Sequence, residues 1–152
     1  MSLVVDASVT LAWFLEGERT GFSEAIFDQV ELLDLWAPAI WLLEVPNALL
    51  VAERKKRINR EMRVEALERA SALGIRIDTA PIDMKTISAL ADRRGLSTYD
   101  AAYLDCALRQ GFDLATLDRQ LAAAAAAEGV PVHSPGRSSA SQVRRRYAGK
   151  AA

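Results

Sequence analysis

The chain is predicted to fold as an α/β protein, a three-layer α/β/α sandwich with a central parallel sheet of four or five strands. Short apolar runs alternate along it with longer segments whose apolar residues recur at helical spacing. This alternation implies parallel strands joined by helices that cover both faces of the sheet. Its 152 residues, 51% of them hydrophobic and 26% charged, are enough for one domain with a sizeable core.

The first half of the chain is predicted to hold two strands and four helices. The strands are expected where short apolar runs stand, at residues 3–5 and 35–37. The helices are expected where apolar residues recur every three or four positions, at residues 8–15, 22–33, 40–56 and 60–73. The third helix is apolar almost all round at its start, so its first half should be buried. Pro46 removes a hydrogen bond there, so this helix either bends at Glu44 or begins later.

The second half is predicted to hold three strands and three helices. The strands are expected at residues 75–77, 114–117 and 130–132, and the helices at residues 83–93, 97–110 and 119–128. Ser97 followed three residues later by Asp100 is a capping-box pattern for a helix start. Pro131 cannot donate a ladder hydrogen bond, which makes the last strand an edge strand.

After His133 the composition changes to small polar residues with scattered basic ones. We therefore expect one domain over residues 1–133 and a flexible basic tail over residues 134–152. The cluster Arg144-Arg145-Arg146 in this tail either contacts nucleic acid or is a solvated basic segment.

Four acidic residues lie beside or within apolar runs, where a chain normally avoids an acid: Asp6, Glu44, Asp100 and Asp118. A buried carboxylate is costly unless a cation meets it. Several carboxylates brought together by a fold are commonly neutralised by a hard divalent cation with oxygen ligands. The net charge is only −1 at pH 7, so the rest of the chain is mildly basic, which suits an anionic substrate.

Topology is expected to bring these acids to one edge of the sheet. Asp6 and Asp118 each follow a strand, and the carboxyl ends of parallel strands form the edge that carries ligand sites. Glu44 and Asp100 lie at or near helix starts that can face the same edge. Supporting contacts are expected from three polar residues close to the acids, Ser8, Asn47 and Thr116.

Each acid also has an ordinary structural explanation. Asp6 and Asp118 are well placed to cap the helices that follow them. Asp100 lies in the first turn of its helix, where the helix dipole favours negative charge. Glu44 has no cap to form, and a salt bridge to an arginine is its best structural explanation.

Several other kinds of site are excluded by composition. His133 is the only histidine, so neither a histidine-based zinc site nor a serine–histidine triad can be built. There is no glycine-rich phosphate loop. The single cysteine, Cys106, rules out an internal disulfide and is expected in the core.

No basic leader precedes the first apolar run, and no apolar run is long enough to cross a bilayer, so a cytoplasmic location without membrane contact is expected.

The acidic motifs together resemble the PIN-domain family over about residues 1–133. Within that family the chain looks most like the bacterial and archaeal VapC-type toxins of toxin–antitoxin pairs. The motifs that carry the resemblance stand in the family's order: Val4-Val5-Asp6-Ala7-Ser8, Leu43-Glu44-Val45-Pro46-Asn47-Ala48-Leu49, Thr98-Tyr99-Asp100-Ala101-Ala102-Tyr103-Leu104 and Leu114-Ala115-Thr116-Leu117-Asp118-Arg119-Gln120-Leu121. The family's four acids fall on Asp6, Glu44, Asp100 and Asp118. Pro46 is a mild departure from the pattern.

The resemblance implies a Mg²⁺- or Mn²⁺-dependent endoribonuclease, usually a homodimer, that is inhibited by a cognate antitoxin. It implies cleavage of single-stranded or loop RNA by metal-activated water, with the four acids as catalytic and metal-binding residues. One acid, Asp118 or Asp100, is expected to orient the water from outside the metal shell. Two alternatives remain: a housekeeping PIN-domain nuclease for RNA processing, and a non-catalytic RNA-binding module on the same fold.

Two further groups of residues are candidates for contacts with a partner. Five basic residues, Arg54, Lys55, Lys56, Arg57 and Arg60, form either a rim that contacts RNA or a protein partner, or a solvated helix end. Trp13 and Phe14 are candidates to pack on a neighbouring protein, whereas Trp36 and Trp41 are expected in the core.

Overall fold

The fold is built around a parallel sheet of five strands in the order β3-β2-β1-β4-β5. The structure, a computed structural model, describes residues 1–133; the predicted tail at residues 134–152 lies outside the described residues. The strands are β1 Ser2–Val5, β2 Asp34–Pro38, β3 Arg76–Asp78, β4 Asp113–Ala115 and β5 Val132–His133. All of their pairings are parallel, as expected for strands that alternate with helices.

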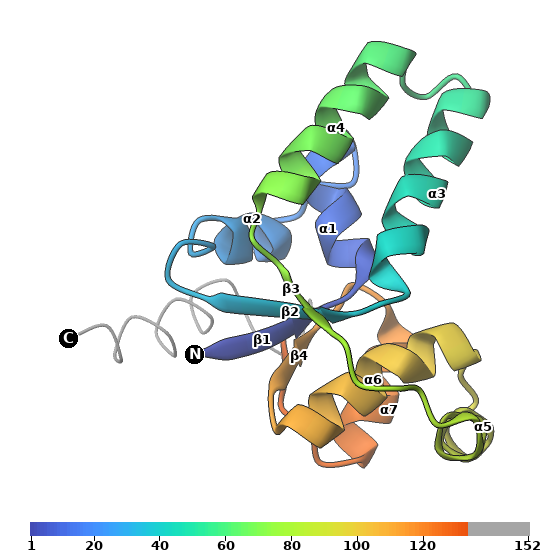
Figure 1. Ribbon diagram of the computed structural model, residues 1–152. Coiled ribbons are helices and arrows are strands. Elements are labelled where there is room, and N and C mark those ends of the chain that lie inside the picture. Colours follow the sequence, from blue (N-terminus) through green and yellow to red (C-terminus); the bar gives the residue numbers. More distant parts are fainter. Residues whose placement is uncertain (134–152) are drawn as a thin grey trace.

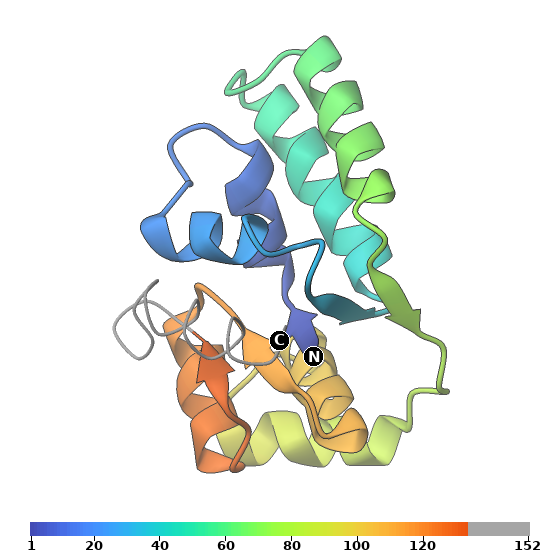
Figure 2. The ribbon, with the colours of Figure 1, turned by 90° about the vertical axis from the view of Figure 1, so that its left-hand side faces the viewer.

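Seven helices in the described residues cover the sheet on both faces: α1 Ala7–Phe14, α2 Gly21–Phe27, α3 Trp41–Arg54, α4 Arg60–Ala72, α5 Met84–Arg94, α6 Thr98–Gln110 and α7 Arg119–Ala127. Helices α1 to α4 lie on one face and α5 to α7 on the other (Figure 1). Figure 2, turned by 90°, shows the same separation, with α3 and α4 extending as a hairpin beyond the sheet. The predicted three-layer α/β/α fold is confirmed.

Strand β1 sits in the middle of the sheet and its side chains point alternately to the two helical layers. Leu3 and Val5 pack with residues of α1 and α2. Val4, between them, packs in the other core cluster with residues of α6 and α7. The strand is therefore buried on both faces, which explains its continuous apolar run.

The register between β1 and β4 fixes what lies at the carboxyl edge. Val5 is the partner of Ala115, and the Asp6 N–H donates to the Ala115 carbonyl at 3.2 Å. Asp6 follows β1 and Thr116 follows β4, so the two residues lie at the same edge of the sheet. In the chain, 110 positions separate them.

Several predicted elements begin or end at different residues in the structure. Helix α2 ends at Phe27, and not at residue 33, because backbone hydrogen bonds of the i to i+3 type tighten residues 28–33 into turns. Strand β4 ends at Ala115, two residues before the predicted end. Strand β5 begins at Val132, because the Val130 N–H bonds back to the Ala125 carbonyl at 2.9 Å and Pro131 has no N–H. As predicted, β5 is an edge strand.

The expectation that the first half of α3 is buried was wrong. Leu42 is 52% exposed and Leu43 is 67% exposed, although Trp41 and Val45 are in the core. The helix begins at Trp41, one residue after the predicted start, and continues through Pro46. Leu42, whose carbonyl loses its partner at Pro46, is exposed, so water can replace the missing donor.

The large side chains correct one further prediction. Trp13, predicted to contact a neighbouring protein, is only 3% exposed, and its Nε1–H donates to the Ser23 carbonyl at 2.8 Å. Trp41 is in the core as predicted, whereas Trp36 is half-buried. Cys106 is fully buried, and burial raises the pKa of its thiol to about 12, which makes it unreactive. Within residues 1–133 no helix is long and apolar enough to cross a membrane.

Candidate active site

Asp6 is the most buried of the four predicted acids. It follows β1 and caps α1, where its Oδ1 accepts a hydrogen bond from the Val9 N–H at 3.1 Å. Ser8 donates to the same oxygen at 2.5 Å, and Thr116 donates to the other carboxylate oxygen. Three hydrogen-bond donors thus hold the side chain of Asp6, which is only 5% exposed. Both structural capping and a functional role are compatible with these contacts.

The hydroxyls of Ser8 and Thr116 also fix the loop that carries Asp118. The Leu117 N–H donates to the Ser8 hydroxyl at 3.0 Å, and the Asp118 N–H donates to the Thr116 hydroxyl at 2.9 Å. Asp118 itself is exposed and caps α7, accepting from the Leu121 N–H at 2.9 Å. The two hydroxyl residues therefore lie between Asp6 and Asp118, where the sequence predicted supporting contacts.

Glu44 and Asp100 come to the same edge from two helices. Glu44, in the first turn of α3, accepts a hydrogen bond on Oε2 from the Tyr103 hydroxyl at 3.0 Å. Asp100 lies in the first turn of α6, whose cap Ser97 accepts from the Asp100 N–H at 3.1 Å. Both acids are half-buried. The predicted structural alternative for Glu44, a salt bridge to an arginine, does not occur among residues 1–133.

The charge of Asp100 links the four acids electrostatically. Burial raises the pKa of Asp6 to about 6, and the charge of Asp100 contributes in the same direction. Burial also raises the pKa of Glu44, again with a contribution from Asp100. The pKa of Asp100 is raised by burial and by the charge of Asp118. Asp100 is thus within electrostatic reach of the other three, and we call these four residues the acidic cluster.

The acidic cluster has the donor chemistry for a hard cation. None of its members forms an ion pair within the described part of the chain, so no opposite charge there compensates the burial of Asp6 or the half-burial of Glu44 and Asp100. Carboxylate and hydroxyl oxygens are ligands that suit Mg²⁺ or Mn²⁺. No three His, Cys, Asp or Glu side chains in residues 1–133 are drawn together as closely as metal ligands are.

Other predicted residues are not brought to the acidic cluster. Asn47 is exposed, and no hydrogen bond to Glu44 is found in the described residues. The five basic residues are exposed at the end of the α3–α4 hairpin, and Arg57 pairs there with Glu18 at 3.0 Å. At 1.5 Å per helical residue, Arg54 lies about 15 Å from Glu44 along α3. The basic residues of the hairpin end are therefore too far from the acidic cluster to contact the same phosphate.

Sequence reasoning missed two residues that connect the elements of this site. Tyr103 hydrogen-bonds Glu44, and its place three residues after Asp100, on the same helix face, was a usable signal. Thr10 donates to the Asp6 carbonyl at 3.2 Å and accepts from the Trp41 indole at 3.0 Å, which ties α1 to the start of α3. Nothing in the local sequence indicates that second link, because it joins residues 31 positions apart.

An apolar cleft of about 410 Å³ adjoins the acidic cluster. Its lining comes from the starts of α3, α5 and α6: Ile40, Ile82, Met84, Ile87, Thr98, Tyr99 and Ala102. Ile82, Met84 and Tyr99 are 56%, 83% and 60% exposed, which is unusual for large apolar side chains. Because Tyr99 directly precedes Asp100, a partner seated here would border the acids.

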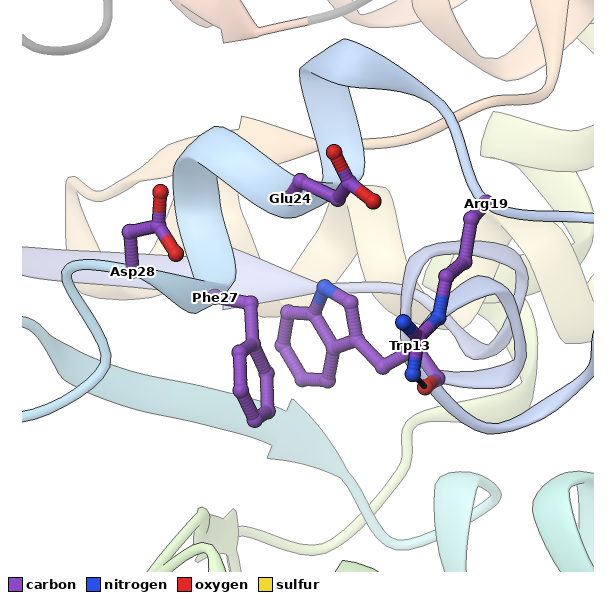
Figure 3. A pocket seen from close by; sticks show the side chains of 5 residues that line it. All are labelled: Trp13, Arg19, Glu24, Phe27 and Asp28. Atoms are coloured by element: carbon purple, nitrogen blue, oxygen red, sulfur yellow. Dashed lines mark hydrogen bonds between the residues drawn. The ribbon is translucent and has the colours of Figure 1, made fainter.

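A second, smaller hollow lies between α1 and α2. Its volume is about 190 Å³, and Figure 3 shows the rings of Trp13 and Phe27 side by side, with Glu24 and Asp28 above them and Arg19 beside Trp13. The two rings are 5.6 Å apart, and Arg19 donates to the Trp13 carbonyl at 3.3 Å. It contains no member of the acidic cluster.

Comparison with known proteins identifies the fold and the relatives of the chain. The PIN domain model matches residues 3–127. The chain is 33% identical over 124 residues to Ribonuclease VapC3 of Pyrobaculum aerophilum, and the match covers 80% of this chain and 93% of that protein.

Solved structures with the same fold include two proteins of different origin. The crystal structure of PAE2754 from Pyrobaculum aerophilum has a TM-score of 0.69 at 22% identity and covers 99% of this chain and 91% of that one. That of VapBC2 from Rickettsia felis, bound to a DNA fragment from their promoter, has a TM-score of 0.64 at 11% identity and covers 88% of this chain and 98% of that one. At these identities the likeness concerns the fold.

Proposed function

Because the chain belongs to the PIN-domain family, we propose that it is an endoribonuclease that cleaves single-stranded or loop RNA as the toxin of a toxin–antitoxin pair. The relative that matches most of the chain bears the name of a ribonuclease. The observation that carries the proposal is Asp6, a buried carboxylate with no cationic partner among the described residues, within electrostatic reach of Asp100. A non-catalytic fold would gain stability by replacing such an acid.

The acidic cluster is proposed to hold Mg²⁺ or Mn²⁺ between the carboxyl ends of β1 and β4 and the starts of α3 and α6. When bound, the ion supplies acidity to water and neutralises charge on the scissile phosphate. Asp6, oriented by Ser8 and Thr116, is proposed as the central ligand, because its carboxylate is fixed by three donors. Asp118, the exposed member, is proposed to orient the attacking water. Attack by external water leaves a 5′-phosphate and a 3′-hydroxyl.

Two protein partners are proposed. A second copy of the chain is proposed to cover the apolar cleft at the starts of α5 and α6, because three of its large apolar side chains are more than half exposed. A cognate antitoxin is proposed as the inhibitor. RNA as substrate implies a cytoplasmic site of action.

The nuclease proposal is tested with purified protein and end-labelled single-stranded RNA. Cleavage is expected with Mg²⁺ or Mn²⁺ and is expected to stop on addition of EDTA. The products are expected to carry 5′-phosphates, which a ligation assay that requires a 5′-phosphate detects. Glu68→Gln removes an exposed acid of α4 outside the cluster and is expected to leave cleavage unchanged.

Three results would count against parts of the proposal. Products with a 2′,3′-cyclic phosphate would show that the RNA 2′-hydroxyl is the nucleophile and would exclude attack by water. Cleavage that persists in EDTA would exclude the metal. Nuclease activity that is not inhibited by any small protein encoded beside this gene would keep the nuclease and exclude the toxin role.

A further inference from the structure

We propose that Tyr103 is a positioning residue that holds the Glu44 carboxylate within the acidic cluster, so that the cluster binds its cation at a lower concentration. This inference rests on the proposed function and adds a residue to which no role has been assigned. Tyr103 does not itself bind the cation. It acts through the hydrogen bond that its hydroxyl donates to Glu44 Oε2 at 3.0 Å.

Glu44 needs such a partner because little else restrains it. Its neighbours Leu42 and Leu43 are mostly exposed, so the surrounding surface does not confine the side chain. The Tyr103 hydroxyl is its one hydrogen-bond donor among the described residues. A glutamate side chain loses rotamer entropy when it is fixed. A donor that fixes it before metal binding removes that cost from the binding step.

Tyr103 is itself fixed by the core. Its residue is only 1% exposed, within the main apolar cluster between the sheet and α6. The ring therefore has one position, and its hydroxyl emerges beside two acids. The hydrogen bond spans 59 positions of chain and ties α6 to α3 at the site.

The surroundings of Tyr103 also keep its proton in place. Burial raises the pKa of the phenol far above its ordinary value, and the charges of Glu44 and Asp6 add to the rise, against a smaller opposite effect of the Ala7 amide. The hydroxyl therefore keeps its proton at neutral pH. It orients a carboxylate as a hydrogen-bond donor and does not act as an acid or a base.

Groups that hydrogen-bond a metal-binding side chain typically contribute 10- to 100-fold to metal affinity. We expect Tyr103→Phe, which removes only the hydroxyl oxygen, to raise the dissociation constant for Mn²⁺ by about 10-fold. The measurement is calorimetric titration of the metal-free protein with Mn²⁺ alone. The metal concentration for half-maximal cleavage should rise in parallel, while cleavage at saturating metal returns to near the parental rate.

Ser2→Ala is the matched control. It also removes one hydroxyl that donates to a carboxylate, that of Asp34 at 2.9 Å, but at the amino end of the sheet. Its Mn²⁺ affinity is expected to equal that of the parent. Thermal unfolding in EDTA verifies that both variants fold, and the increase in melting temperature produced by Mn²⁺ should be smaller only for Tyr103→Phe.

A double variant distinguishes positioning from a general effect on packing. If Tyr103 acts through Glu44, then adding Tyr103→Phe to Glu44→Gln should weaken Mn²⁺ binding no further than Glu44→Gln alone. Additive losses would overturn the inference. So would a Tyr103→Phe dissociation constant within two-fold of the parent when Glu44→Gln weakens binding, and in that case the proposed function stands. If neither Glu44→Gln nor Asp6→Asn changes Mn²⁺ binding, the proposed metal site itself is wrong.

Discussion

Two groups of acids in this domain each include a carboxylate residue that is almost fully buried, and the groups differ in what neutralises that charge. In the first, the acidic cluster, no cation of the described chain pairs with a carboxylate. In the second, which we call the Arg109 group, Arg109 bridges Asp78 at 2.5 Å and Asp105 at 2.7 Å. Asp78 and Asp105 are 6% and 8% exposed, close to the 5% of Asp6.

The most buried acid of each group, Asp6 and Asp78, has its pKa shifted in the opposite direction from the other. Burial raises the pKa of Asp78, but the hydrogen bond from Arg109, the hydrogen bond from the Ala80 amide and the charge of Arg109 act together against it, so the net pKa is lowered. For Asp6, burial outweighs three hydrogen bonds and the pKa rises to about 6. A buried acid with an arginine is a structural element. A buried acid without one lowers stability unless a cation is bound, and it is therefore the better candidate for function.

The largest expected effect is the loss of RNA cleavage in Asp6→Asn. Removing the central carboxylate should lower the cleavage rate about 1,000-fold, in the range seen when one group that stabilises charge in the transition state is lost. The control is Asp105→Asn, which removes an equally buried acid of the Arg109 group and should leave the rate per folded molecule unchanged. If Asp6→Asn cleaved RNA at the parental rate, the acidic cluster would be no more important for cleavage than the Arg109 group.

The second effect concerns pH and the metal-free protein. Because the folded pKa of Asp6 is raised from 3.8 to about 6, the folded state binds the extra proton, and stability should fall as pH rises from about 4 to 6. The loss for this group is about 3 kcal/mol at most, since each pKa unit corresponds to 1.36 kcal/mol. Urea unfolding in EDTA at several pH values measures it, and the difference between parent and Asp6→Asn isolates Asp6.

Saturating Mn²⁺ should cancel most of this loss at pH 7, because the bound cation favours the ionised carboxylate. Equal pH dependence of the parent and Asp6→Asn would contradict the assignment of the raised pKa.

The third effect is the destabilisation by Arg109→Met. Removing the guanidinium leaves Asp78 buried without a partner, which should cost about 2 kcal/mol, less than for a fully buried pair because the Arg109 side chain is 38% exposed. Urea unfolding at pH 7 measures the loss, and cleavage per folded molecule should not change. A variant with parental stability but impaired cleavage would place the Arg109 group in the active site.

The smallest effect is expected from the basic residues at the end of the α3–α4 hairpin. Arg54→Gln with Arg60→Gln should raise the KM for RNA a few-fold and leave kcat unchanged, because phosphate contacts contribute affinity that falls with salt. The salt dependence of KM should become shallower. An unchanged KM at low salt would indicate a solvated helix end without RNA contact.

The sequence by itself determined the layered fold and the place where a site can form. Apolar runs and helical spacing are local patterns, so the order of strands and helices was predictable. Acids that directly follow short strands were expected at the carboxyl edge of the sheet. The end of α2 was not predictable, because turns over residues 28–33 replace a pattern that still looks helical. The roles of Asp6, Glu44, Asp100 and Asp118 stay predictions.

Only the tertiary structure decided which acids have a cationic partner and which do not. Asp78 and Arg109 meet across 31 positions, and Tyr103 and Glu44 across 59, so no local pattern could reveal either contact. The sequence could not predict which apolar side chains of α3 are exposed either. Leu42 and Leu43 are as apolar as their buried neighbours and differ only in what packs on them. Periodicity along the chain fixes the elements, whereas the free energy of a buried charge depends on groups that the fold brings from elsewhere.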